Sequence, residues 1–112
     1  MDKIVERSLL FDIYGNLLTE HQRKIYSDVV NNDYSLSEIG EEMGISRQGV
    51  HDLVKRVDRQ LKEYEQKLGL VDRFLKIRSE VNGIRAMAEC GKLSDEESGN
   101  IIRICDRILT EL

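Results

Sequence analysis

The chain has 112 residues and a formal net charge of −4, from 17 lysines and arginines against 21 aspartates and glutamates. A chain of this length builds about one domain. The acidic balance excludes the basic surplus of a protein that coats nucleic acid or anionic membrane without selectivity. Any nucleic-acid binding must therefore be local.

Cysteine use and hydropathy exclude further classes. Cys90 and Cys105 are too few and too widely spaced for a disulfide framework or a structural zinc site. The early apolar cluster ends at Asp12, and no stretch approaches the roughly 20 apolar residues that cross a bilayer. We therefore expect a cytoplasmic protein without membrane contact, metal or cofactor, whose two reduced thiols are buried at apolar helix positions.

Apolar residues recur at helical spacing along nearly the whole chain, which predicts an all-α fold of six helices. The first helix is expected at about residues 3–14, with a stop at residues 15–16. The second begins at Thr19, whose hydroxyl and the side chain of Gln22 can form a capping box. Residues 31–33 then read as a turn.

The next two helices differ in length. A short helix opens with a capping box from Ser35 to Glu38 and ends at Gly44. Ser46 caps a long helix that Gly69 terminates, about 33 Å in length, so its second half is expected to extend beyond the N-terminal helices. Its apolar positions alternate four and three residues apart: Val50, Val54, Val57, Leu61, Tyr64 and Leu68.

The C-terminal part predicts two more amphipathic helices. One covers about residues 70–89, and the last opens with a capping box at residues 94–97. Their apolar stripes are Leu70, Phe74, Ile77, Val81, Ile84 and Ala88, then Ile101, Cys105, Ile108 and Leu112. We predict a core at residues 1–68 and a hairpin for dimer or partner contacts at residues 69–112, within one continuous structural domain.

Residues 36–55 predict a helix-turn-helix. Gly40 is the small residue needed where two steeply crossing helices approach, and Gly44 tolerates the positive φ of the turn. The side chains expected to hold the two helices together are Ile39, Met43, Ile45, Val50 and Leu53. The alternative is a plain helical hairpin without a ligand, which also needs apolar faces and a turn glycine.

If the motif binds DNA, the outward face of its second helix supplies the contacts. Arg47 suits guanine and Gln48 suits adenine in the major groove, whereas basic residues further along suit phosphates. The candidate nucleic-acid-binding residues are Ser46, Arg47, Gln48, His51, Asp52, Lys55, Arg56 and Arg59. Residues 45–60 hold four cations against two anions, and residues 1–44 hold four against nine. So weak a basic strip predicts weak binding by one copy and favours a homodimer.

Catalysis has little support in the sequence. His21 and His51 are the only histidines, and no Gly-rich phosphate loop of the Walker type occurs. His51 and Asp52 are adjacent on a helix, where neighbouring side chains point about 100° apart. We therefore expect that the protein is not an enzyme.

Two resemblances follow from these motifs. The helix-turn-helix, of a winged-helix-like or sigma-like type, resembles region four of bacterial sigma factors over about half of the chain. The residues concerned are Leu18-Thr19, Gln22-Arg23, Ser35, Glu38-Ile39-Gly40, Met43-Gly44-Ile45-Ser46, Val50, Arg56-Val57 and Leu61. Region four reads promoter elements, so this resemblance implies DNA binding.

The closer resemblance is to the YlxM family of Gram-positive bacteria, from about residue 8 to residue 68. It is carried by Leu10-Phe11-Asp12-Ile13-Tyr14, Leu17-Leu18-Thr19, Asp33-Tyr34-Ser35-Leu36, Ser46-Arg47-Gln48-Gly49-Val50-His51-Asp52, Lys55-Arg56 and Tyr64-Glu65-x-Lys67-Leu68. Glycine at 49 and histidine at 51 depart from the alanine and tyrosine common in that family.

The YlxM family is encoded beside Ffh, the GTPase of the signal recognition particle, so the resemblance implies a role in that protein-targeting pathway. Two hypotheses follow. The protein is a DNA-binding regulator that inserts the helix after Ser46 into DNA. Alternatively, it is an accessory module that docks on Ffh or on the signal-recognition-particle RNA and uses the helix-turn-helix only as a scaffold.

Overall fold

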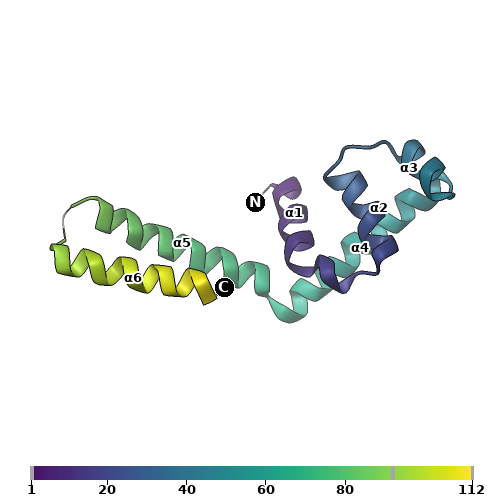
Figure 1. Ribbon diagram of the computed structural model, residues 1–112. Helices are drawn as coiled ribbons and strands as arrows, with labels where there is room; N and C mark the ends of the chain where they lie inside the picture. The colour runs from purple at the N-terminus through teal and green to yellow at the C-terminus, as the bar shows by residue number, and fades with distance from the viewer. Residues whose placement is uncertain (1, 92, 112) are drawn as a thin grey trace. The chain divides into compact units, whose positions relative to one another are not determined.

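The computed structural model describes residues 2–91 and 93–111, the last of these by its backbone alone, and they form six α-helices and one 3-10 turn (Figure 1). The elements are α1 (Lys3–Tyr14), η1 (Gly15–Leu17), α2 (Glu20–Val30), α3 (Leu36–Met43), α4 (Arg47–Leu68), α5 (Leu70–Glu89) and α6 (Asp95–Glu111). The all-α prediction is confirmed, and the described residues contain no strand that could form a β-wing. None of their helices is both long and apolar enough to cross a membrane.

The helix starts follow the side-chain caps that the sequence predicts. Thr19 and Gln22 form the complete capping box of α2. Ser35 accepts the amide of Glu38 at 3.1 Å, and Ser46 accepts the amide of Gly49 at 2.9 Å. At α6 the Ser94 hydroxyl accepts the amide of residue 97 and donates to its carboxylate. Because each cap satisfies an amide that the helix leaves free, these local bonds fix where the helices begin.

Helix α1 lies along the second half of α4 and runs in the same direction. Arg7 and Tyr14, two helical turns apart on α1, hydrogen-bond to Asp58 and Glu65, which have the same separation on α4. The sequence predicts that this half of α4 extends beyond the N-terminal helices. That expectation is wrong for the part up to Glu65, which α1 accompanies. Only near its end is an apolar side chain of α4 exposed, at Leu68.

The junction between α4 and α5 is held by side chains from outside α5. Gly69 ends α4 in the left-handed conformation, with φ +61°. The first free amides of α5 then donate to neighbours: Leu70 N to Tyr14 Oη at 3.1 Å and Val71 N to Glu65 Oε1 at 3.0 Å. A carboxylate at a helix N-terminus also stabilises the helix dipole, so these two bonds hold the backbone of Leu70 and Val71 within the first unit.

The chain divides into two compact units, residues 1–71 and 72–112. In the first unit, α1 to α4 enclose a core whose members are less than a tenth exposed: Leu10, Tyr14, Leu18, Ile25, Tyr26, Ile39, Val50, Val54, Val57, Leu61 and Val71. Aromatic contacts join the helices within it, with ring centroids 5.4 Å apart for Phe11 and Tyr26 and 5.9 Å for Tyr14 and Tyr64.

In the second unit, α5 and α6 form an antiparallel hairpin (Figure 1). Its buried side chains are Val81, Ala88 and Cys105, and the Cys105 thiol points at the carbonyl of Val81, 3.8 Å away. Three expectations need correction. Ile84 on the predicted stripe is exposed, as is Leu70 at the junction, and the thiol predicted to be buried at Cys90 is exposed. The stripe position Leu112 lies outside the described residues.

Candidate nucleic-acid interface

The turn between α3 and α4 uses both motif glycines as the sequence predicts. Gly44 has φ +73°, a left-handed conformation that favours glycine. A Cβ on Gly40 would lie 2.6 Å from the carbonyl oxygen of Ile45, which is closer than real side chains approach a backbone. The amide of Ile45 donates to the Gly40 carbonyl at 2.9 Å. The missing side chain therefore lets the turn close directly against α3.

The apolar side chains of the motif anchor both helices to the core of the first unit. Ile39 and Val50 are fully buried, and the other three, Met43, Ile45 and Leu53, are half-buried. All five thus contact the protein interior from the positions that the helix-turn-helix pattern assigns to them. This packing fixes the rotation of α4 about its axis and hence the side chains that it exposes.

The predicted contact residues lie on the opposite side of α4. Seven of the eight are exposed: Ser46, Arg47, Gln48, Asp52, Lys55, Arg56 and Arg59. The exception is His51, whose side chain is 43% exposed and whose Nδ1 is buried without a hydrogen-bond partner in the described part of the chain. The structure brings these residues onto one helix face, which we call the α4 face.

Polar contacts within the α4 face orient two of its side chains. The Gln48 amide nitrogen donates to Asp52 Oδ1 at 2.9 Å. His51 Nδ1 lies 3.8 Å from the same carboxylate oxygen, which is too long for a hydrogen bond. Arg47, Gln48 and His51, with Leu36 from α3, line an open hollow of about 480 Å³ at this end of the helix. The face thus presents hydrogen-bond donors and acceptors, which base-edge contacts require.

One of the two acidic residues counted in the strip is turned away from the α4 face. Asp58 accepts two hydrogen bonds from the Arg7 guanidinium, at 3.1 and 2.6 Å, and one from the Tyr26 hydroxyl at 2.5 Å. The bond to Asp58 is the main reason that the pKa of Arg7 is raised. Burial, and then the bond to Asp58, raise the pKa of Tyr26 well above its ordinary value. The strip therefore has more net positive charge than the sequence count gave.

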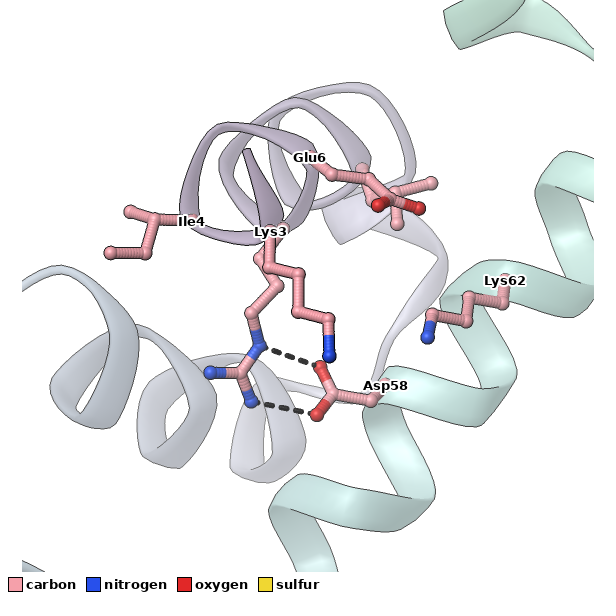
Figure 2. A pocket seen from close by; sticks show the side chains of 7 residues that line it. Lys3, Ile4, Glu6, Asp58 and Lys62 are labelled. Carbon is pink, nitrogen blue, oxygen red and sulfur yellow. Dashed lines mark hydrogen bonds and ion pairs between the residues drawn. The ribbon is translucent and has the colours of Figure 1, made fainter. Parts of the chain in front are cut away.

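The same cluster borders a hollow of about 290 Å³ between α1 and α4 (Figure 2). Lys3 and Lys62 extend toward Asp58 from the two helices, whereas Ile4 points away. Since Asp58 already accepts bonds from Arg7 and Tyr26, its carboxylate serves the joint between the helices. Sequence reasoning missed this joint. The available signal was the shared seven-residue spacing of Arg7 with Tyr14 and of Asp58 with Glu65.

A second polar cluster, also missed, shapes the connection from α2 to α3. Asp28 is buried, and its carboxylate accepts bonds from Lys24 at 2.9 Å and from the Asn32 amide at 3.0 Å. The bond from Lys24 is the largest cause of the lowered pKa of Asp28. Its backbone carbonyl accepts the amide of Tyr34, and Asp33 takes a positive φ of 56°. These bonds direct the chain into α3.

Within residues 2–91 and 93–111, no group of three or more histidine, cysteine, aspartate or glutamate side chains is placed to hold a metal ion. His21 is exposed on α2. The chemistry that the α4 face offers is hydrogen bonding and charge.

Comparison with known proteins identifies the family. The family model described as "Putative helix-turn-helix protein, YlxM / p13 like", UPF0122, matches residues 1–100. The chain belongs to this family. The match continues beyond the limit near residue 68 that the sequence motifs suggested, through α5 and into the beginning of α6.

Individual relatives agree with the family model. A UPF0122 protein of Acetivibrio thermocellus is 42% identical over 112 aligned residues, covering 96% of this chain and 95% of the relative. One from Thermoanaerobacter sp. is 40% identical and covers 99% of this chain and 94% of its own. One from Halalkalibacterium halodurans is 49% identical over 81 residues, with 72% and 73% coverage. The YlxM-type resemblance of the sequence is thereby confirmed.

Proposed function

We propose that this protein is a DNA-binding regulator that inserts the N-terminal half of α4 into the major groove. The observation that carries the proposal is the α4 face itself. Arg47, Gln48 and Lys55 are exposed on a helix whose rotation is fixed by the buried Ile39 and Val50. This is how a recognition helix presents its side chains to base edges.

Charge supports local docking on DNA. Of the charged residues from 45 to 60, four are cations and two are anions, but Asp58 is paired with Arg7. The exposed strip therefore carries four positive charges against the single negative charge of Asp52, a surplus of three. Lys55, Arg56 and Arg59 can neutralise three phosphates, which gives a salt slope of roughly 2.7 per copy. Binding is then expected to weaken roughly 40-fold between 50 and 200 mM salt.

Base discrimination is assigned to Arg47 and Gln48. Arg47 suits the two acceptors of guanine. The Gln48 amide has a second N–H besides the one donated to Asp52, so it retains a donor and an acceptor for adenine. Each such contact is worth about 1–3 kcal/mol of discrimination. Lys55, Arg56 and Arg59 supply the phosphate contacts, which position the helix without reading sequence.

The proposal includes a homodimer and a cytoplasmic site of action. A surplus of three charges makes one copy a weak binder, whereas two copies place two recognition helices on one duplex. A role in the signal-recognition-particle pathway remains a proposal that follows from the resemblance to the YlxM family. In the alternative, the protein docks on Ffh or on the particle's RNA. Asp52 favours this alternative, because its carboxylate stands within the α4 face and repels phosphates.

A titration by fluorescence anisotropy at 50 and 200 mM salt tests the proposal. The probes are a duplex from upstream of the protein's own gene, a scrambled duplex, the signal-recognition-particle RNA and labelled Ffh. We expect salt-dependent binding to DNA, with a preference for the upstream duplex that Arg47→Ala removes. Lys67→Ala is the matched control, because it deletes an exposed cation at the other end of the same helix and should keep the preference.

Two results would overturn the proposal in favour of the alternative. One is undetectable DNA binding at micromolar protein together with a complex on Ffh or the RNA. The other is that Arg47→Ala and Lys67→Ala change the DNA affinity by the same small amount. The α4 face would then not be the contact surface.

A further inference from the structure

The C-terminal hairpin leaves apolar side chains of both its helices in solvent. In a pair of helices each buries only the stripe that faces the other, and a wider apolar arc stays uncovered. Ile84 is 37% exposed, Met87 61% and Ile104 45%. Exposed apolar clusters of this kind are typical of interaction surfaces.

Helix geometry places these three side chains on one face of the hairpin. Cys105 and Val81 mark a common level, because the thiol contacts the Val81 carbonyl. At about 100° per residue, Ile84 and Met87 lie roughly 60° and 120° to one side of Val81. Ile104 lies roughly 100° to the same side of Cys105. Because α5 and α6 are antiparallel, the same rotation away from their contact leads to the same side of the pair. Ile84, Met87 and Ile104 therefore lie on one face, which we call the hairpin face.

The two ends of the hairpin face carry opposite charge. At the open end, the exposed Arg73 lies roughly 80° from Val81, on the same side as Ile84 and Met87. At the turn end, the exposed Glu97 lies roughly 80° from Cys105, on the same side as Ile104. Two copies packed with their turn ends together would bring the two Glu97 carboxylates close. Two copies packed in opposite directions place Glu97 beside Arg73 at both ends.

We propose that the hairpin face is the interface of a homodimer in which the two hairpins run in opposite directions. A two-fold dimer uses the same patch on both copies, so the patch must be self-complementary. Ile104 lies near the middle of the hairpin, where the two-fold axis would pass, and Ile84 and Met87 lie about one and two helical turns nearer the turn end. Arg73 and Glu97 lie toward the two ends, where the same axis exchanges them. The contact completes a four-helix bundle.

This dimer does not depend on DNA binding, and its test uses the full chain without nucleic acid. Sedimentation velocity measures the dissociation constant of the wild type, of Ile104→Glu and of Ile4→Glu. Ile4 on α1 is the matched control, because it is 72% exposed but belongs to the other unit. We expect the wild type to dimerise at micromolar concentration. The dissociation constant should rise at least tenfold for Ile104→Glu and stay unchanged for Ile4→Glu.

Met87→Glu provides a second variant if Ile104→Glu lowers the helix content measured by circular dichroism. A monomeric wild type at 100 μM would overturn the proposal, since the face is then covered within the chain or by a different protein. A dimer that neither substitution weakens would also overturn it, because the interface would lie elsewhere.

Direction is tested by charge reversal and by cross-linking. Arg73→Glu and Glu97→Lys each place like charges at both ends and should weaken the dimer about three- to tenfold, whereas the double variant should recover most of the affinity. The exposed thiol of Cys90 lies at the turn end. Opposed hairpins keep the two Cys90 residues well beyond the roughly 7 Å between Cα atoms that a disulfide allows. Rapid formation of a Cys90–Cys90 disulfide within the dimer would contradict the opposed arrangement.

Discussion

The N-terminal unit and the C-terminal hairpin are both built from amphipathic helices, but the first buries many more apolar side chains than the second. Three helices, α1 to α3, pack against α4 in the first unit, and polar bonds from Arg7 and Tyr14 join α1 to α4. The hairpin buries Val81, Ala88 and Cys105 and leaves Ile84 and Ile104 in solvent. In the proposed function, the closed core of the first unit holds the α4 face in place. In the proposed dimer, the hairpin supplies the surface for a second copy.

The largest expected effect comes from a core truncation on each side of this comparison. Val57 is fully buried in the first unit, and Val57→Ala should lower its free energy of unfolding by about 2–3 kcal/mol, because a closed core adds a cavity cost to the loss of burial. Val81→Ala removes two methyl groups from the hairpin and should cost about 1.5 kcal/mol, at about 0.8 kcal/mol per group. Urea unfolding with hydrogen exchange checks both. Equal costs would contradict the difference in packing between the two units.

A smaller effect is expected at the turn of the helix-turn-helix. Gly40→Ala places a Cβ against the Ile45 carbonyl oxygen, 2.6 Å away in the present backbone, and overpacking of this kind costs about 1–3 kcal/mol. Gly83→Ala is the control, because nothing lies within 4 Å of its added Cβ and helix propensity alone should make it slightly stabilising. Thermal unfolding compares the two. A neutral Gly40→Ala would show that α3 and α4 do not approach this closely.

The joint between α1 and α4 should contribute less than the core. Asp58→Asn removes the charge that the Arg7 guanidinium contacts and weakens the bond from Tyr26, which should cost about 1–2 kcal/mol. The ion pair is partly exposed, with side-chain exposures of 36% and 27%, so solvent screening keeps the value low. Asp12→Asn on the exposed side of α1 is the control and should change stability by less than about 0.5 kcal/mol. Chemical denaturation measures both variants. If Asp58→Asn and Asp12→Asn changed the free energy of unfolding equally, the joint would add no stability.

The smallest effect is a pH dependence at the same joint. Burial and the bond to Asp58 raise the pKa of Tyr26 above its unfolded value of about 10. The folded state therefore holds this proton more tightly, so its stabilisation is complete below about pH 10 and is lost as the pH rises further. Tyr26→Phe should lower the free energy of unfolding by about 1 kcal/mol at pH 7. Its stability should also fall less steeply than that of the wild type as the pH rises above about 10. Urea midpoints between pH 8 and 11 measure both slopes, and parallel slopes would contradict the assignment.

The features that the sequence predicts well are local ones. Thr19, Ser35, Ser46 and Ser94 cap helices because a hydroxyl bonds an amide three residues later, and such a pattern is visible in a few letters. The positive φ of Gly44 is predictable in the same way, because a glycine that follows the last apolar position of a helix usually ends it in the left-handed conformation. The family model and the relatives confirm the resulting helix-turn-helix assignment at the level of the family.

The features that the sequence does not predict depend on contacts between distant residues. Arg7 and Asp58 are 51 positions apart, and the only sequence signal for their contact is the seven-residue spacing that Arg7 shares with Tyr14 and Asp58 with Glu65. The exposed Ile84 and Cys90 show a related limit. Helical spacing identifies an apolar stripe, but the width that a neighbouring helix covers depends on how closely the two pack.

The most direct test of the proposed function is a two-dimensional NMR titration of ¹⁵N-labelled protein with a duplex from upstream of its own gene. The account predicts chemical-shift changes concentrated on residues 46–59, largest near Arg47 and Gln48, and small changes at α1 and α2. Changes centred on residues 95–110 instead, or none at all at saturating DNA, would contradict it.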